Sequence, residues 1–202
     1  EMEKRGGEVV ACDLSDKETW DHVPYDNIVP DHVMTERKDR IRRLNNAWWL
    51  GHRLFHSKAK VVYSSVYDIP DDIGFCNISV FGSILLHLRD PFLALQKAAK
   101  LTSETIVVTD IDPIIFQPRN IMKRVLAGLF EQDGPPKMYF MPNPYTKEPP
   151  DTWWVLSPNL VCGFLKLLGF PDLTVTYHKQ KRLLDDKEIK EIPLFTVVGK
   201  RI

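Results

Sequence analysis

Residues 77–91 read NISVFGSILLHLRDP, and they hold most of one strand and the start of one helix. The run 76–83 is apolar almost throughout, which is typical of a strand that is buried on both faces. Asp90 and Pro91 fit the N-cap and the first turn of a helix that we expect to extend to about Leu101. The stretch therefore predicts a strand followed by a helix, the repeating unit of a parallel sheet.

Further strands and helices are expected on both sides of this unit. Apolar positions at steps of three and four predict a helix over 35–56, with Thr35 as its N-cap. Strands that alternate with helices are typical of an α/β domain. We expect strands near 8–12, 59–64, 76–83, 104–109, 172–178 and 193–199, a charged connector over 179–191, and helices over 35–56, 90–101, 120–130 and 157–168, the last with Gly169 after its end.

The composition favours one domain, over residues 1–202, without disulfides. The chain has 27 Lys and Arg against 27 Asp and Glu, and three widely spaced cysteines. A chain of this length can fold without a disulfide or a metal, and the cysteine pattern favours reduced thiols in a cytoplasmic protein. No apolar run approaches the roughly 20 residues of a membrane span, and residues 1–10 do not resemble a signal peptide. Spacings such as HExxH do not occur, so no metal site is expected.

The residues that directly follow the expected strands are the candidates for a ligand site, because doubly wound sheets bind ligands there. Asp13 could accept hydrogen bonds from both hydroxyls of a ribose, or it could only cap a loop. Gly82 could admit a flat ligand group to the backbone, or it could accommodate packing. His87 is a weak candidate for a catalytic proton acceptor, with a structurally hydrogen-bonded histidine as the alternative.

A proline-rich segment, residues 133–151, precedes two adjacent tryptophans. It carries six prolines, and a loop this long inside a compact domain is usually functional or disordered. Trp153 and Trp154 point to different sides of an extended chain, so we expect one in the core and leave open whether the other lines a substrate pocket. We interpret 133–151 as a lid on the substrate side, with Tyr145 and one of the tryptophans against the acceptor.

Taken in order, these segments resemble class I S-adenosylmethionine-dependent methyltransferases, over essentially the whole chain. The nearest subgroup is similar to transferases that modify the wobble uridine of transfer RNA. The resemblance implies a Rossmann-like, doubly wound, mostly parallel sheet with a C-terminal antiparallel hairpin, in which only the last strand is reversed. The segments that carry it are 8–13 (EVVACD), 61–70 (VVYSSVYDIP), 77–91, 105–110 and 153–170 (WWVLSPNLVCGFLKLLGF).

The resemblance also implies S-adenosylmethionine as the cofactor and assigns its contacts. It places Asp13 on the ribose and Leu14 beside the adenine. The residues expected at the adenine edge and along the remaining wall are Ser65, Val66, Phe81, Gly82 and Ser83.

Two departures from the family pattern affect these expectations. The family's first strand and its glycine-rich loop are not found, since residues 1–7 (EMEKRGG) resemble the end of the helix that follows that loop. We therefore expect the strands near 8–12 and 76–83 to flank a gap, and we expect this chain to bind the cofactor weakly or not at all. Ser65 stands where the family often has an acid, so a hydrogen bond from the adenine amino group loses its charge assistance.

The resemblance implies in-line methyl transfer to a nucleophile, in which the enzyme mainly supplies orientation and, for some acceptors, a base. A small-molecule acceptor is favoured over transfer RNA, because acidic residues surround the expected mouth. The basic helix face with Arg40 and Arg43 keeps transfer RNA open as a partner. The alternatives are a catalytically degenerate binding module and, ranked last, a nicotinamide-dependent oxidoreductase, whose glycine fingerprint and Tyr-xxx-Lys pair are not found. The sequence does not identify the oligomeric state.

Overall fold

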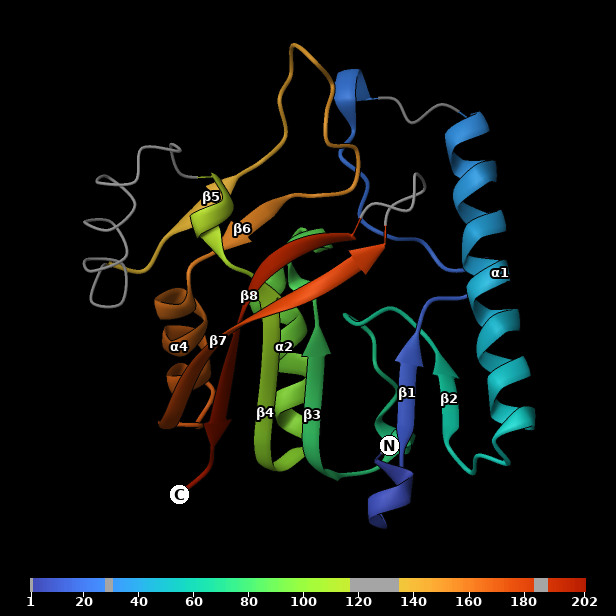
Figure 1. Ribbon diagram of the computed structural model, residues 1–202, viewed down its shortest axis with the longest axis vertical. Coiled ribbons are helices and arrows are strands. Elements are labelled where there is room, and N and C mark those ends of the chain that lie inside the picture. The colour runs from blue at the N-terminus through green and yellow to red at the C-terminus, as the bar shows by residue number, and fades with distance from the viewer. Residues whose placement is uncertain (1, 28–30, 117–134, 184–188) are drawn as a thin grey trace. The chain divides into compact units, whose positions relative to one another are not determined.

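The computed structural model describes residues 2–27, 31–116, 135–183 and 189–202. The chain divides into two compact units, Glu1–Gly74 and Phe75–Ile202, and each unit is described by itself (Figure 1). The expectation of one domain over residues 1–202 stays a prediction. In the described part of the chain, no helix is both long enough and apolar enough to cross a membrane.

The N-terminal unit pairs two short parallel strands and carries one long helix. β1 (Val10–Asp13) and β2 (Lys60–Tyr63) align from Val10 opposite Lys60 to Asp13 opposite Tyr63. Helix α1 (Asp31–Leu54) connects them along the chain. Both strands were expected from the sequence, and their parallel pairing fits a crossover connection through a helix.

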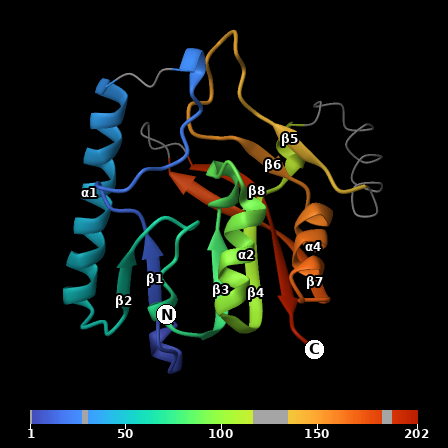
Figure 2. The same cartoon turned by 180° about the vertical axis from the view of Figure 1, so that it is seen from behind.

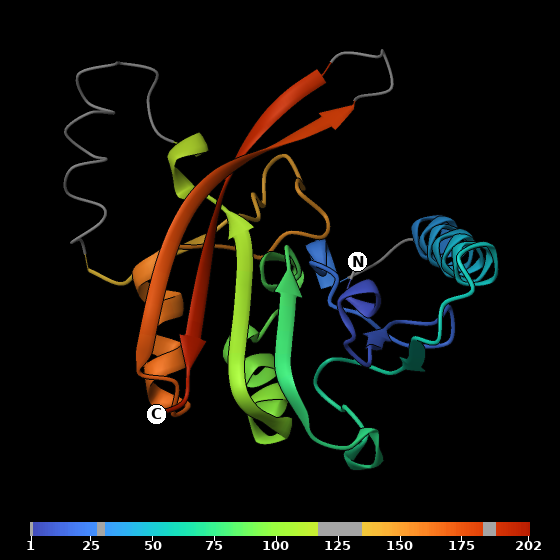
Figure 3. The same ribbon diagram turned by 60° about the horizontal axis from the view of Figure 1, so that its bottom comes forward.

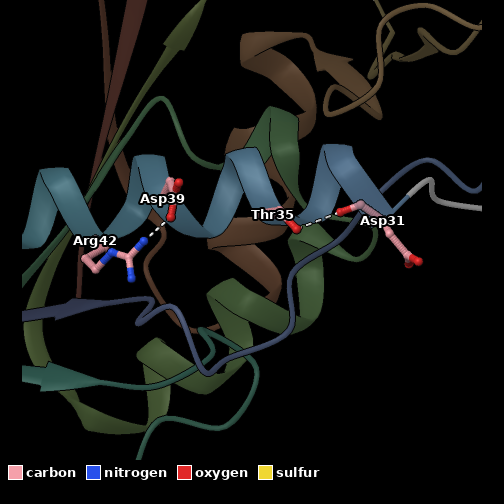
Figure 4. A network of polar contacts seen from close by, with 4 residues as sticks. All are labelled: Asp31, Thr35, Asp39 and Arg42. Carbon is pink, nitrogen blue, oxygen red and sulfur yellow. Dashed lines mark hydrogen bonds and ion pairs between the residues drawn. The ribbon is translucent and has the colours of Figure 1, made fainter.

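Helix α1 begins four residues earlier than expected, so the prediction of Thr35 as its N-cap is wrong. The Thr35 hydroxyl lies inside the helix and donates to the Asp31 carbonyl oxygen at 2.9 Å, as threonines within helices often do (Figure 4). One turn further on, Arg42 and Asp39 form an ion pair on the exposed helix surface. Asp31 in the first turn is favoured there by the helix dipole.

The C-terminal unit is built on a four-stranded sheet in the order β3-β4-β8-β7. β3 and β4 are parallel, whereas β8 is antiparallel to both of its neighbours. Only β8 is therefore reversed, as expected from the sequence, and β7 with β8 forms the predicted C-terminal hairpin. The strands are β3 (Cys76–Gly82), β4 (Thr102–Ile111), β7 (Asp172–Leu183) and β8 (Ile189–Lys200).

Two helices cover one face of this sheet (Figure 2). They are α2 (Pro91–Leu101) and α4 (Pro158–Leu167), and the rings of Phe92 and Phe164 meet edge to face at 5.0 Å. On the sheet side, this core contains fully buried Ile106, Val108, Phe195 and Val197. On β3, Ile78 and Val80 are 56% and 51% exposed.

Both helix starts in this unit follow the expected capping chemistry. The Asp90 carboxylate accepts a hydrogen bond from the Leu93 N–H at 2.8 Å, with Pro91 in the first turn. The Ser157 hydroxyl oxygen accepts a hydrogen bond from the Leu160 N–H at 3.3 Å, and Pro158 occupies the first turn. After α4, Gly169 has the positive φ of 89° that the end of a helix favours in glycine.

Three features of this unit differ from the sequence-based expectations. The first is that β3 is not buried on both faces, since Ile78 and Val80 are exposed. The segment 179–191 is largely strand rather than a connector, since β7 and β8 pair from Asp172 opposite Lys200 to Leu183 opposite Ile189 (Figure 3). Pairing extended into a charged sequence because both strands are exposed there and opposite charges meet on the diagonal between them, as Lys179 and Glu191 do in an ion pair of 2.9 Å. A small antiparallel pair, β5 (Met138–Phe140) and β6 (Trp154–Leu156), was missed. The expected helix over 120–130 lies outside the described residues.

The outer edges of β1 and β3 are the places where the sequence predicts a missing strand. Among the described residues, β1 pairs with β2 alone, and β3 pairs with β4 alone. Each sheet thus has an edge where a further strand could pair. The absence of the family's first strand stays a prediction.

Candidate functional site

In the N-terminal unit, the end of β1 presents an exposed carboxylate. One oxygen of Asp13 accepts a hydrogen bond from the Leu14 N–H at 2.8 Å. The Leu14 carbonyl oxygen accepts another from the Asn45 side chain of α1 at 3.1 Å. These two contacts hold the backbone just after the strand. The Asp13 carboxylate is therefore presented as a hydrogen-bond acceptor at the carboxyl end of β1.

The turn after β2 lies next to Asp13. The Ser64 N–H donates to the Asp13 carbonyl oxygen at 3.0 Å, which joins the two strand ends. Ser65 Oγ accepts from the Tyr67 N–H at 3.2 Å, and its carbonyl oxygen accepts from the Asp68 N–H at 2.9 Å. The N-terminal unit therefore brings four predicted residues to one edge: Asp13, Leu14, Ser65 and Val66.

In the C-terminal unit, the chain leaves β3 through a sharp turn. The Phe81 side chain is buried in the core, so only its backbone lies toward the strand end. Gly82 is exposed, and a Cβ added there would meet nothing within 4 Å. Ser83 has a positive φ of 53°, and its N–H donates to the Thr109 carbonyl oxygen of β4 at 2.8 Å. Gly82 and Ser83 therefore offer open backbone at the carboxyl end of β3.

A short 3-10 helix, Leu85–His87, follows this turn and carries the exposed imidazole of His87. His87 Nδ1 is 2.5 Å from the Asp151 carbonyl oxygen. The Trp153 N–H donates to the Leu86 carbonyl oxygen at 2.9 Å. Residues 151–153 are therefore fixed against Leu85–His87 by two hydrogen bonds.

The two tryptophans contact the same region from the next positions. The indole N–H of Trp154 donates to the Arg89 carbonyl oxygen at 3.1 Å, and its ring lies 5.3 Å from that of Phe140. The Arg89 guanidinium lies over the Trp153 ring at 5.1 Å from its centroid. Tyr145 is not brought to this cluster by any described contact and is 93% exposed, in a turn where its N–H donates to Asn143 Oδ1. The structure thus joins Trp153 and Trp154 to the His87 region, and the expectation that one of them lies in the core is wrong, because both are only partly buried.

Asp110 directly follows the apolar run 105–109, so the sequence places it, with Asp112, at the mouth of the expected pocket. It belongs to β4, is 1% exposed, and its Oδ1 accepts from the Ile111 N–H at 2.7 Å. Its Oδ2 is buried and has no hydrogen-bond partner among the described residues. Burial raises the pKa of Asp110 to about 6, although the Ile111 N–H, the His87 charge and the Leu86 N–H act to lower it. The burial of Asp110 is what the sequence did not predict.

Asp112 lies two residues further on, where the chain leaves the sheet. Its carboxylate accepts from the Ile114 N–H at 3.0 Å. Partial burial raises the pKa of Asp112 as well. The carboxyl end of β4 therefore holds two acids in a desolvated setting, one of them nearly inaccessible.

Comparisons with known proteins come from solved structures. No protein-family model and no curated protein matches the sequence. The N-terminal domain of EvdMO1 with SAH bound is similar over 100% of this chain and 78% of its own, at 15% identity and a TM-score of 0.52. A putative methyltransferase from Bacillus halodurans matches 96% of this chain and 82% of its own, at 12% identity and a TM-score of 0.48. Magnesium protoporphyrin IX methyltransferase from Synechocystis, with bound SAH, matches 78% of this chain and 58% of its own, at 10% identity and a TM-score of 0.46.

Likeness at these identities shows the fold alone. The α/β, Rossmann-like fold of class I methyltransferases that the sequence predicted is confirmed, including its closing antiparallel hairpin. Such a fold hosts many activities, so function has to be argued from the site.

Proposed function

We propose that this chain belongs to an S-adenosylmethionine-dependent methyltransferase. The observation that carries the proposal is the likeness of its fold to the EvdMO1 domain, which was crystallised with SAH, over 78% of that domain. The exposed carboxylate of Asp13 at the end of β1 supports it, since a carboxylate there can accept hydrogen bonds from both ribose hydroxyls.

The residues of each unit fit part of such a ligand. In the N-terminal unit, Asp13 would hold the ribose, Leu14 would lie beside the adenine, and Val66 would meet the adenine edge. Ser65 already accepts a hydrogen bond from the Tyr67 N–H, so its hydroxyl hydrogen is the group to offer to an adenine nitrogen. In the C-terminal unit, the backbone of Phe81, Gly82 and Ser83 would line the wall, because no side chain obstructs Gly82.

The bound group would supply a methyl group already activated as a sulfonium. The protein then has to bind the acceptor, orient it in line with that methyl group, exclude water and, for some acceptors, take up a proton. These tasks need no fixed pair of catalytic residues, so the acceptor side varies between enzymes of one fold.

A small-molecule acceptor fits the region around Trp153 and Trp154. Aromatic rings with one polar edge suit an organic acceptor. Trp153 is held to Leu86 and Trp154 to Arg89 by hydrogen bonds. Transfer RNA is the alternative acceptor, which the exposed Arg40 and Arg43 of α1 would serve. Binding of transfer RNA with a steep salt dependence, abolished by Arg40→Glu with Arg43→Glu, would favour the alternative.

A catalytically degenerate binding module is the second candidate function. Among the described residues, β1 pairs with β2 alone and β3 with β4 alone, so each unit by itself has a sheet edge that no strand covers, and this favours the second candidate. This candidate predicts binding of SAH without methyl transfer to any acceptor.

Amide NMR of the 15N-labelled chain during titration with S-adenosylhomocysteine tests the proposal, because shift changes report even weak binding. We expect saturable changes at residues 13–14, 65–66 and 82–83. Titration with NAD is the control and should leave these amides unchanged. Saturable changes confined to other segments, or equal changes at these amides with NAD, would contradict the proposal.

A further inference from the structure

A buried histidine of the N-terminal unit joins the loop after β1 to helix α1. His22 is 8% exposed, and its Nδ1 lies 2.7 Å from Nη1 of Arg37 in α1. A guanidinium carries only donors, so Nδ1 of His22 is the acceptor of this hydrogen bond. The proton of neutral His22 therefore belongs on Nε2. The Trp20 ring lies beside the imidazole, with 4.9 Å between the two ring centroids.

The residue before His22 joins the same loop to the turn after β2. The Tyr67 hydroxyl donates a hydrogen bond to the Asp21 carboxylate. Tyr67 also donates its backbone N–H to Ser65 Oγ at 3.2 Å. Two consecutive residues of the loop are therefore attached to two different elements, and one of these is the turn that carries Ser65 and Val66.

The start of the loop is attached to α1 as well. The Asn45 side chain donates to the Leu14 carbonyl oxygen at 3.1 Å, and Leu14 directly follows Asp13 at the end of β1. Arg37 and Asn45 both belong to α1, so one helix holds the loop at Leu14 and again at His22.

Protonation of His22 would remove the second of these attachments to α1. An imidazolium donates from both nitrogens and a guanidinium donates only, so neither could accept from the other. The two positive charges would also repel each other, and the burial of His22 limits screening by water. An unperturbed imidazole gains its proton near about pH 6.5, so this change lies in a range that cells reach.

Other charged groups of the adjoining segments would not restore the contact. Asp21 precedes His22 in the loop, and an attraction between its carboxylate and a protonated His22 would act within the loop, without reaching α1. Tyr67 faces the loop from the turn after β2 through Asp21. The remaining charged or titratable residues of the loop, of the first turns of α1 and of that turn are Asp16, Lys17, Glu18, Tyr25, Asp26, Asp31, His32, Glu36, Lys38 and Asp68.

We propose that His22 and Arg37 form a pH-sensitive clasp, which holds the loop after β1, residues 14–27, against α1 when His22 is neutral and releases it when His22 is protonated. Release would weaken the support that the loop gives, through Asp21 and Tyr67, to the turn at residues 65–66. The regulation of a nucleoside site by this clasp rests on the proposed function, whereas the clasp itself requires no ligand.

NMR of the 15N-labelled full chain without ligand tests the clasp. The 15N shifts of His22 at pH 7.5 are expected to show a proton on Nε2 and none on Nδ1. The Tyr25 amide donates to the Val23 carbonyl oxygen within the loop, and its protection against hydrogen exchange is expected to fall about 10-fold between pH 7.5 and 5. The amides of residues 65–66 are expected to shift with the same midpoint, because the loop and the turn are attached.

Three variants and one control separate the clasp from general effects of pH. His22→Gln keeps a side-chain oxygen that can accept from Arg37 but does not titrate, so both pH-dependent changes are expected to disappear. Arg37→Met is expected to show the low protection already at pH 7.5, and Arg37→Lys, which retains a donor, is expected to restore protection. Arg42→Met, on the exposed surface of the same helix, is the control and should titrate as the wild type does.

A proton on Nδ1 of neutral His22, or loop protection that falls with pH equally in His22→Gln, would overturn the clasp. Wild-type protection in Arg37→Met would overturn it as well. A change at Tyr25 that leaves residues 65–66 unmoved would overturn its reach to the nucleoside site. These outcomes are measured without ligand, so they are distinct from a failure of the proposed function, which the titration with S-adenosylhomocysteine at neutral pH reports.

Discussion

The Trp153 N–H donates a hydrogen bond to the Leu86 carbonyl oxygen, 2.9 Å away. This bond joins two segments that are far apart in the sequence: the turn after β3 and the end of the proline-rich segment. It brings the backbone of Trp153 to the turn that carries the exposed imidazole of His87. The expected lid, residues 133–151, is thus anchored at its C-terminal end beside the end of β3, and its closure over an acceptor stays a prediction.

Replacement of Asp13 by Ala is expected to weaken binding of S-adenosylhomocysteine by about 10- to 100-fold. The loss of hydrogen bonds to a charged group costs roughly 1.5–3 kcal/mol. NMR titration or calorimetry measures the change in the dissociation constant. Asp16→Ala, in the same loop, is the matched control and is expected to have no effect. Equal affinities of Asp13→Ala and the wild type would exclude the ribose assignment.

Replacement of Asp110 by Asn is expected to stabilise the protein at neutral pH. The pKa of Asp110 is raised by burial from 3.8 to about 6, so between about pH 4 and 6 the folded chain binds a proton that the unfolded chain has lost. Wild-type stability therefore falls as the pH rises through this window, and the loss persists above it. Asn carries no charge and still accepts from the Ile111 N–H.

The expected gain for Asp110→Asn is about 1–3 kcal/mol in the free energy of unfolding at pH 7, vanishing below about pH 4. Urea denaturation at pH 4, 5, 6 and 7 measures it. The gain should grow with pH, and a gain that is the same at all four pH values would argue against burial of the charge.

Replacement of Trp154 by Phe tests the attachment of β6 to the turn after β3. The variant keeps a ring against Phe140 but loses the hydrogen bond from the indole N–H to the Arg89 carbonyl oxygen. We expect a loss of about 0.5–1.5 kcal/mol in stability. Amide hydrogen exchange over 151–156 is expected to accelerate, while exchange in β1 and β2 stays as in the wild type.

Two glycines of the C-terminal unit are expected to respond in opposite directions to replacement by Ala. At Gly199, a Cβ would lie 3.0 Å from Leu165 Cδ1 and 3.1 Å from Leu173 Cδ2, so we expect Gly199→Ala to lose about 1–3 kcal/mol. At Gly163, inside α4, nothing lies within 4 Å of the added Cβ. Gly163→Ala is expected to gain about 0.5–1 kcal/mol through helix propensity. Thermal unfolding compares the two directly. Destabilisation by Gly163→Ala would contradict the open space at that position, and an unchanged stability of Gly199→Ala would contradict the close packing of Leu165 and Leu173 at Gly199.

Local sequence patterns predicted most of the secondary structure. Asp90 with Pro91 and Ser157 with Pro158 are capping pairs whose chemistry acts within one helical turn, and both helices begin where these pairs predict. Apolar runs located all six expected strands for the same reason. Thr35 failed as an N-cap because a threonine hydroxyl bonds equally well to a carbonyl inside a helix.

The sequence by itself determined the α/β class, the positions of the strands and the carboxylate that ends β1, because periodicity and capping depend on neighbours along the chain. Only the tertiary structure decided that β7 and β8 pair over their whole length, that Trp153 contacts the turn after β3, and that Asp110 is buried beside His87. Each of these depends on segments distant in sequence. The strength of a charge or a hydrogen bond is set by what packs around it, and no local pattern specifies those neighbours.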